Sequence, residues 1–279
     1  MMKFKHLGMS SRSVALVGGL LGVLSLAIGA HAALNRRAQN AAKTMRAEPS
    51  DGITKPARLA LVIGNGHYPD ASDPLVQPIN DARVLTCTLR RNGFDVDLLE
   101  DASKDDMEYA IARLKSRIKK DAVVMLFFGG YGVQAGGQTY MIPIDARIWR
   151  ERDLEREGVS VESLLSDTKE SGARAKLVVL DASRRNPYER RFRAYSHGLA
   201  PIADADKALI LTSASPGKVA DDSTGRNSVL VSELLKNFST GAGIENAFNQ
   251  TRISIKRASN GAQVPSVNST LVEDIILGG

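Results

Sequence analysis

Uninterrupted apolar runs are the feature of this sequence that most constrains its fold. Residues 177–180 are four leucine or valine residues in succession, and the runs at 58–64 and 122–128 are almost as apolar. A strand that is buried on both faces has this pattern, whereas a strand with one solvated face alternates. Such strands are typical of parallel sheets covered by helices on both sides. The sequence therefore predicts an α/β domain.

Segments of helical periodicity separate these runs. Ser103 is expected to cap one helix, whose apolar residues recur at helical spacing. Further helices are expected over 80–92 (capped by Asn80 and ended by Gly93), 161–170, 228–237 and 244–257, and further strands over 94–99 and 208–213. The resulting alternation predicts a three-layer αβα sandwich with a doubly wound, mostly parallel sheet.

Two polar motifs follow the apolar runs and mark a candidate site. The run at 177–180 ends in DASRRNP, which contains Asp181 and Ser183, and the run at 122–128 ends in GGYG, which contains Tyr131. Ligands in open α/β sheets bind beyond the carboxyl ends of the strands. If the two strands are neighbours, these loops lie within side-chain reach of each other.

Composition excludes several classes of function. Of the 37 basic residues, Lys3, Lys5 and Arg12 lie in the N-terminal 32 residues, which contain no acid; this leaves 34 basic against 31 acidic residues and no basic helix interleaved with aromatic residues. We therefore expect no nucleic-acid partner. Cys87 is the only cysteine, so an internal disulfide is impossible. We expect it to be a half-buried structural thiol.

No cofactor or metal is expected. The Gly-Asn-Gly turn at 64–66 lacks the third glycine of a dinucleotide-binding turn, because Pro69 stands at that position. The chain has four histidines, two of them at positions 6 and 31, and no acidic spacing that requires calcium.

The N-terminal 32 residues resemble a secretory signal peptide. Residues 1–13 are basic and polar, 14–30 are apolar, and Ala30-His31-Ala32 fits a signal-peptidase site. The alternative is an uncleaved membrane anchor, since about 17 apolar residues is the short limit for a span. Residues 33–56 are expected to be a linker. We expect export to the periplasm, or anchoring in the inner membrane with the domain outside the cytoplasm; only this segment would contact a membrane.

The motifs resemble those of the caspase-like cysteine peptidases (peptidase C14), in particular the bacterial metacaspase-like or orthocaspase branch. The resemblance runs from about Arg58 to about Leu271. The segments that carry it, in order, are LALVIGNGHY, PINDARVLTCTLRRNGFDV, GGQTYMIPIDA, LVVLDASRRNP, HGLA, SASPGKVADDSTGRNS and AQVP. It implies a caspase-like (p20-like) domain over residues 57–275.

The departures from the family pattern fall on its catalytic dyad. Tyr131 stands where the resemblance implies the catalytic histidine, and Ser183 where it implies the nucleophilic cysteine. A thiol has a pKa of ~8.5 and histidine one of ~6.5, whereas tyrosine at ~10 is a poor base at neutral pH. The backbone N–H groups of Gly132 and Ser183 would remain as an oxyanion hole. Asp81 and Asp181 match family positions for an acidic pocket that receives a basic P1 side chain.

Three functions follow as alternatives. The leading one is a non-catalytic, peptide-binding or regulatory pseudo-peptidase that holds a peptide or protein segment with a basic residue. The second is a residual hydrolase with Ser183 as nucleophile, assisted by Tyr131 or His67. The third is a structural interaction domain, with the loop at 184–206 as its partner surface. As structural alternatives, Tyr131 covers the end of the sheet and Ser183 caps the next segment. Asp81 would then be an acid in the first turn of a helix, where the helix dipole favours a negative charge.

Overall fold

A computed structural model describes residues 56–69, 74–188, 198–202, 205–220, 225–238 and 243–277. The segment expected to be a signal peptide or anchor, and almost all of the expected linker, lie outside these residues. No helix within the described ranges combines the length and the apolar character needed to cross a bilayer.

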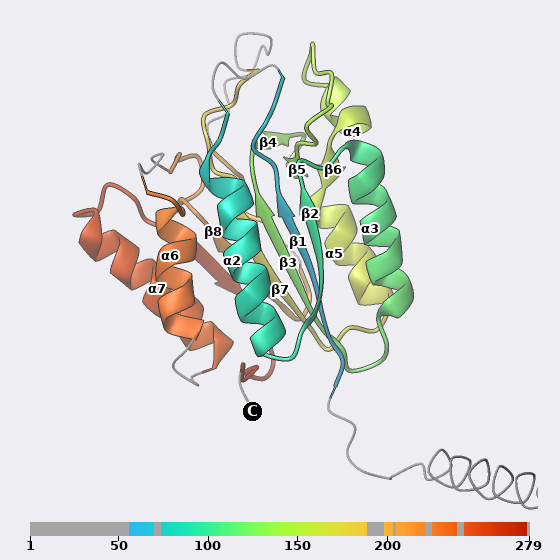
Figure 1. Ribbon diagram of the computed structural model, residues 1–279, viewed down its shortest axis with the longest axis vertical. Helices are drawn as coiled ribbons and strands as arrows, with labels where there is room; N and C mark the ends of the chain where they lie inside the picture. The colour runs from blue at the N-terminus through green and yellow to red at the C-terminus, as the bar shows by residue number, and fades with distance from the viewer. Residues whose placement is uncertain are drawn as a thin grey trace, which may run out of the picture. The chain divides into compact units, whose positions relative to one another are not determined.

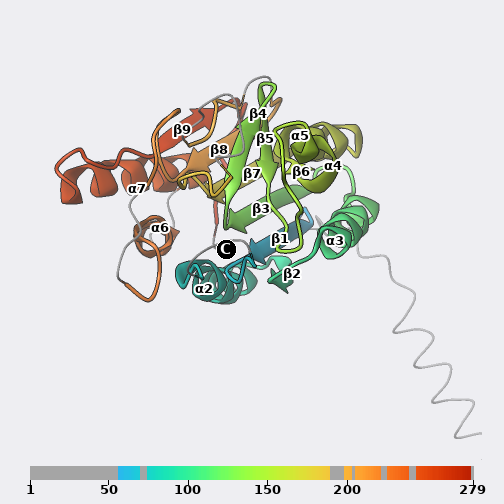
Figure 2. The same cartoon turned by 90° about the horizontal axis from the view of Figure 1, so that it is seen from above.

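The apolar runs form the centre of a six-stranded sheet with the order β2-β1-β3-β7-β8-β9 (Figures 1 and 2). The strands are β1 (Arg58–Gly64), β2 (Asp95–Glu100), β3 (Val123–Gly129), β7 (Ala175–Asp181), β8 (Ala208–Thr212) and β9 (Ser266–Ser269). All neighbours run parallel except β9, which is antiparallel to β8. The expected mostly parallel sheet is confirmed.

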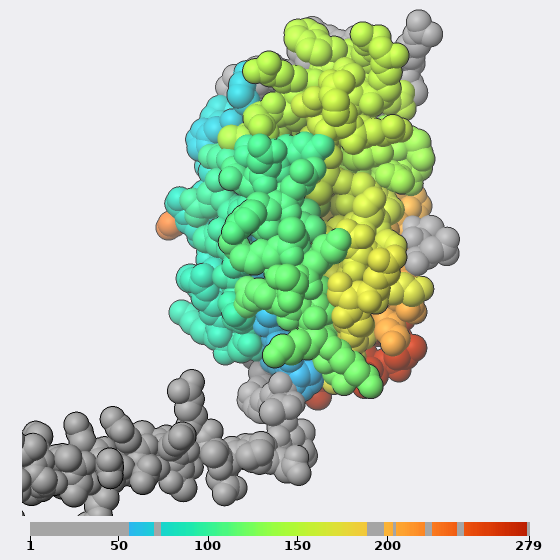
Figure 3. Space-filling model, turned by 90° about the vertical axis from the view of Figure 1, so that its right-hand side faces the viewer, coloured from blue at the N-terminus to red at the C-terminus, as the bar shows by residue number. Residues whose placement is uncertain are grey.

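Helices cover both faces of this sheet and complete a three-layer sandwich (Figure 1). One face packs against α2 (Gln77–Arg91), α6 (Val229–Phe238) and α7 (Ile244–Ala258), and the other against α3 (Lys104–Arg117) and α5 (Val161–Glu170). Figure 3 views the α3 and α5 face. Because adjacent residues of a strand point to opposite faces, Phe127 belongs to the first core layer and Phe128 to the second.

A small antiparallel sheet follows β3 at the carboxyl end of the main sheet. Its order is β4-β5-β6, with β4 (Gly132–Ala135), β5 (Gln138–Met141) and β6 (Val159–Ser160). In this sheet β4 and β5 form the two arms of a hairpin. Between β5 and β6, residues 145–158 form a charged excursion, which contains α4 (Asp153–Glu157).

Several local expectations need correction. Helix α2 begins at Gln77 rather than at Asn80, because Pro78 is tolerated in the first turn, where its missing N–H costs no helical hydrogen bond. Asn80 does not cap the helix; its side-chain amide donates to the carbonyls of Val76 and Arg226. Cys87 is exposed rather than half-buried. The cap at Ser103 is confirmed, in a reciprocal capping box.

Candidate functional site

The two loops expected to form the site are held side by side. In the parallel pairing of β3 with β7, Gly129 lies level with Asp181, so both strands end at the same edge. Two further hydrogen bonds continue the pairing into the loops: Gly130 N–H donates to the Asp181 carbonyl (3.3 Å) and Gly132 N–H to the Ala182 carbonyl (3.1 Å). Tyr131, between these two glycines, and Ser183, directly after Ala182, therefore lie on adjacent loops.

The glycines of the GGYG motif allow this close approach. A Cβ atom at Gly132 would lie 2.9 Å from the Cβ of Ala182 and 2.8 Å from the side chain of Leu199. Gly130 has φ +155°, and a Cβ there would lie 2.5 Å from the hydroxyl oxygen of Tyr68. A side chain at residue 132 would push the two loops apart, and one at residue 130 would displace Tyr68, so both glycines are a packing requirement of the site.

Ser183 is completely enclosed. Its exposed fraction is 0%. Its N–H donates to Ser213 Oγ (3.3 Å), and its carbonyl accepts from the N–H of Ala220 (2.7 Å). Its own hydroxyl oxygen has no hydrogen-bond partner among the described residues. A buried polar atom without a partner is costly and is uncommon outside functional sites.

Tyr131 is half-buried and packs on a second tyrosine. Its ring meets that of Tyr68 edge-on, with 4.8 Å between the ring centroids. Its N–H donates to the Tyr68 hydroxyl oxygen (3.1 Å), and this hydroxyl donates in turn to the carbonyl of Ile142 (2.9 Å). Burial raises the pKa of Tyr68 well above its usual value, so this phenol stays neutral and acts as a fixed structural bridge.

The expected oxyanion donors are both occupied. Gly132 N–H is bonded to the Ala182 carbonyl, and Ser183 N–H to Ser213 Oγ. A substrate oxyanion would have to displace these partners, because each N–H group donates only one strong hydrogen bond. The expectation of an open oxyanion hole at Gly132 and Ser183 therefore does not hold in this conformation.

His67 is paired with the carboxylate of Asp101. Its Nδ1 lies 2.6 Å from Asp101 Oδ2, and its side chain is 67% exposed. It follows β1, and β3 separates β1 from β7 and Ser183. Partial burial acts to raise the pKa of Asp101, but the N–H groups of His67 and Gly66 and the imidazole together hold it below its usual value. Thus the one histidine within the described residues is engaged elsewhere; His197 lies outside them.

Asp181, two residues before Ser183, lies close enough to a second buried acid, Asp81, for their charges to interact. Asp81 Oδ1 accepts from Asn227 Nδ2 (2.8 Å) and from the N–H of Ser228 (3.1 Å). Burial and the negative charge of Asp181 raise its pKa to about 6. Asp181 is 3% exposed, and its Oδ2 has no partner among the described residues. Because α2 begins at Gln77, Asp81 lies in the second turn, so a dipole role in the first turn is wrong.

Asp81 is part of a larger contact between α2 and the segment 225–228, which we call the α6 lead segment. Asn80 Nδ2 donates to the carbonyl of Arg226 (3.1 Å), and Gln77 Nε2 donates to the carbonyl of Gly225 (3.5 Å). Ser228 caps α6, since its Oγ accepts from the N–H of Val231 (3.1 Å). The sequence analysis predicted a helix start at residue 228, but it did not predict that Asn227 and Ser228 bond to Asp81.

A sequence profile of the caspase domain matches residues 57–276. The chain belongs to the caspase domain family. It is 28% identical over 134 residues to the mucosa-associated lymphoid tissue lymphoma translocation protein 1 of Homo sapiens and to its homolog in Mus musculus. These matches cover 47% of this chain but only 16% of each relative.

The fold of this caspase domain is also that of a solved caspase. Caspase-1 from Spodoptera frugiperda superposes with a TM-score of 0.60 at 16% identity, covering 82% of this chain and 94% of the insect chain. At this identity the likeness concerns the fold alone. It agrees with the three-layer sandwich.

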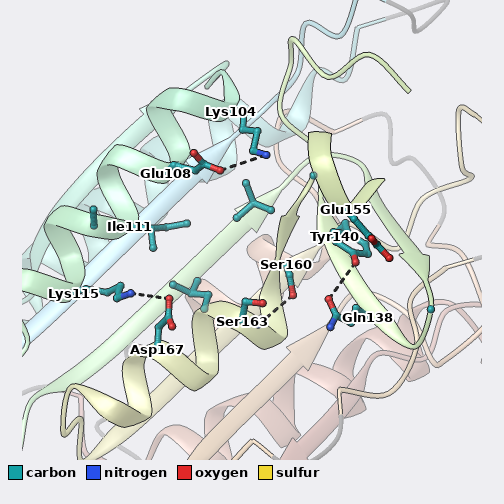
Figure 4. Close-up of a pocket in the computed structure, with 15 residues that line it drawn as sticks. Lys104, Glu108, Ile111, Lys115, Gln138, Tyr140, Glu155, Ser160, Ser163 and Asp167 are labelled. Atoms are coloured by element: carbon teal, nitrogen blue, oxygen red, sulfur yellow. Dashed lines mark hydrogen bonds and ion pairs between the residues drawn. The ribbon is translucent and has the colours of Figure 1, made fainter. Parts of the chain in front are cut away.

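A hollow of about 540 Å³ lies elsewhere on the caspase domain, between α3 and α5 (Figure 4). Its charged groups already pair with one another: Lys104 with Glu108 (3.4 Å) and Lys115 with Asp167 (2.8 Å). Such a self-neutralised surface offers little charge to a ligand. Within the described residues, no group of three or more His, Cys, Asp or Glu side chains is placed to hold a metal ion.

Proposed function

We propose that this caspase domain is a non-catalytic, peptide-binding or regulatory member of its family, with Tyr131 and Ser183 at the dyad positions. The supporting observation is the enclosed hydroxyl of Ser183, which has no base among the described residues within hydrogen-bond reach. A serine attacks a carbonyl only when such a base removes its proton. Tyrosine, with a pKa of ~10, is unsuited to remove that proton at neutral pH.

The backbone supports the same proposal. Stabilising a tetrahedral intermediate requires N–H donors directed at the oxyanion, and losing one donor costs ~10²–10³ in rate. Here the N–H groups of Gly132 and Ser183 bond to Ala182 and Ser213. A substrate would therefore meet neither an activated nucleophile nor free donors.

We further propose that Asp81 and Asp181 receive a basic side chain of a bound peptide. Two neighbouring carboxylates repel each other, and an arginine or lysine between them would remove that repulsion. The α6 lead segment covers Asp81. Binding of a basic side chain to Asp81 therefore requires its hydrogen bonds from Asn227 Nδ2 and the Ser228 N–H to break. Binding should thus be coupled to movement at the start of α6.

The first test measures hydrolysis. The parent protein, Ser183→Ala and the Ser183→Cys/Tyr131→His double variant are incubated with fluorogenic peptides that carry arginine or lysine at P1. We expect the parent and Ser183→Ala to be equally silent at neutral pH. Parental turnover that disappears in Ser183→Ala would instead establish the alternative function, a serine hydrolase. An active double variant would show that only the dyad was lost.

The second test measures binding with labelled arginine peptides by fluorescence anisotropy. We expect Asp181→Asn to weaken binding about tenfold or more at pH 7.5, because a charged pair between buried groups is lost. Asp167→Asn, which removes a charge between α3 and α5, is the matched control and should not change the affinity. Equal binding of an arginine peptide and its citrulline analogue would contradict an acidic pocket.

We also propose that the domain is exported, through cleavage after Ala32 or with residues 14–30 retained as an anchor. The mass of the protein recovered from cells separates the two, since cleavage leaves Ala33 as the first residue. A protein with an intact N-terminus in the soluble cytoplasmic fraction would contradict both.

A further inference from the structure

Residues 213–220, which we call the clamp segment, hold the backbone of Ser183 at both of its polar groups. The N–H of Ser183 donates to Ser213 Oγ (3.3 Å), and the carbonyl of Ser183 accepts from the N–H of Ala220 (2.7 Å). Ser183 and Ser213 are both completely buried. One segment, which follows β8 in the chain, therefore occupies both the donor and the acceptor of this backbone unit.

The start of the clamp segment is fixed by the main sheet. Ser213 follows the last residue of β8, and its N–H donates to the carbonyl of Leu180 in β7 (3.0 Å). The parallel pairing of β7 with β8 thus continues by one residue beyond the strand. The hydroxyl of Ser213 is therefore placed beside the loop that follows β7 by strand pairing.

Gln263 holds the clamp segment from the connection between α7 and β9. This buried side chain donates through Nε2 to the carbonyl of Ser213 (2.9 Å). Its own N–H donates to Ser259 Oγ (3.0 Å), directly after α7. A second bond runs the other way, from Ser215 Oγ to the carbonyl of Val264 (2.8 Å). The end of α7 is thus connected to the backbone of residue 213.

The outer part of the clamp segment packs against residues 198 and 199. Gly198 has φ +65°, and a Cβ atom there would lie 2.0 Å from the carbonyl oxygen of Lys218. The N–H of Gly217 donates to the carbonyl of Leu199 (3.2 Å), whose side chain lies against Gly132. The clamp segment is therefore also packed, through Leu199, against the GGYG motif.

The closed arrangement has an energetic cost at the residues that it covers. Ser183 Oγ and Asp181 Oδ2 are buried, and neither has a hydrogen-bond partner among the described residues. Water or a ligand would satisfy both atoms once the segment that covers Ser183 moves away. Regions that open locally, below the free energy of global unfolding, are those in which the closed state is only weakly favoured.

We propose that the clamp segment is an internal gate for residue 183. Residue 183 is closed off while Ser213 and Ala220 bond its backbone, and Gln263 is the positioning residue that favours this closed state. Local opening of the clamp segment, without unfolding of the domain, admits a ligand or reagent. The proposal concerns access to residue 183, so it holds whether or not this residue acts on a substrate.

A thiol at residue 183 tests the gate, because it reacts with iodoacetamide only when the reagent reaches it. The reference variant is Ser183→Cys/Cys87→Ser, which removes the exposed thiol of Cys87. Alkylation is followed by mass spectrometry at about pH 8.5, near the pKa of a thiol. We expect the introduced thiol to react about tenfold or more slowly than Cys87 of the parent protein. Equal rates would mean that residue 183 is not closed off, and the proposal would be wrong.

Two substitutions in the reference variant weaken the closed state. Ser213→Ala and Gln263→Met each remove one hydrogen bond, so each should speed alkylation about fivefold or more. The matched control is Thr168→Val, which removes the bonds of a buried hydroxyl to Leu164 and Leu165 within α5. It should lower the melting temperature without changing the rate. Unchanged rates in both test variants, or equal acceleration in the control, would contradict the gate.

Hydrogen exchange with the native Ser183 in place gives a second readout. The N–H of Ala220 bonds to Ser183 and not to Ser213. In Ser213→Ala the amides of residues 183 and 220 should nevertheless lose protection together, because the clamp segment opens as a unit. Loss at residue 183 alone would make Ser213 a local contact and overturn the proposal. None of these measurements uses a peptide, so the proposed function is tested separately.

Discussion

At the scale of single residues, the most informative group is the carboxylate of Asp81. It is buried next to a second acid, and its hydrogen bonds to Asn227 and Ser228 do not offset this environment, so its pKa is raised to about 6. The folded protein therefore holds a proton more tightly than the unfolded chain, in which aspartate has a pKa of ~3.9. A site that bears such a cost for a carboxylate is a candidate for binding a cation.

This cost predicts how stability depends on pH. Because the pKa of Asp81 is higher in the folded state, its contribution favours folding below about pH 4 and is lost as the pH rises to about 6. Asp81→Asn should remove this loss and stabilise the protein at pH 7.5 by on the order of 1–3 kcal/mol. Denaturant unfolding at pH 4 and pH 7.5 measures both values.

The control for this experiment is Asp101→Asn, which should have the opposite effect. The pKa of Asp101 is lowered in the folded protein, so its ionised form stabilises at neutral pH, and that stability is lost as the pH falls. If Asp81→Asn were instead destabilising at pH 7.5, the buried carboxylate would be a structural anchor for the α6 lead segment.

At the scale of elements, the sequence was sufficient to predict a strand where a run of consecutive residues is buried, and a helix start where the capping residues are close in sequence. The apolar runs predicted the central parallel strands, and Ser103 predicted the start of α3. Strand β9 was missed because SVNS is short, only partly buried and stabilised by pairing with β8. The contact of Asp81 with Asn227 joins residues 146 positions apart, so no local pattern could predict it.

The capping box of α3 gives a prediction for a single element. Ser103 Oγ accepts from the N–H of Asp106, whose carboxylate accepts from the N–H of Ser103. Ser103→Ala should cost about 1 kcal/mol of unfolding free energy. Ser163→Ala, also near a helix start but without a hydrogen bond from its hydroxyl to the described residues, should cost little. Equal losses in chemical denaturation would mean that the box contributes nothing specific.

At the scale of the whole described domain, one sheet serves two cores. Phe127 and Phe128 are both completely buried, yet they belong to opposite layers, one beneath α2 and the other beneath α3 and α5. Layers that share every central strand cannot unfold separately without exposing the other side of the same strands. The domain should therefore behave as one cooperative unit.

Truncation in either layer tests this cooperativity. Phe127→Leu and Phe128→Leu should each destabilise the protein by about 1–3 kcal/mol, since buried volume is lost. Thermal melts followed by far-UV circular dichroism and by Trp149 fluorescence should coincide in both variants. Two separate transitions in either variant would show that the layers unfold independently.

The two hydrogen bonds that extend the β3 and β7 pairing into the loops have a consequence for how this site can evolve. Gly130 and Gly132 donate to the backbone of the neighbouring loop, not to any side chain. These backbone hydrogen bonds therefore do not depend on which side chains stand at residues 131 and 183. Evolution can therefore replace a nucleophile at residue 183 by an inert residue, or restore it, while the backbone pairing of the two loops is kept. In hydrogen exchange these two loop amides should be protected like amides within a strand, whichever side chains occupy the dyad positions.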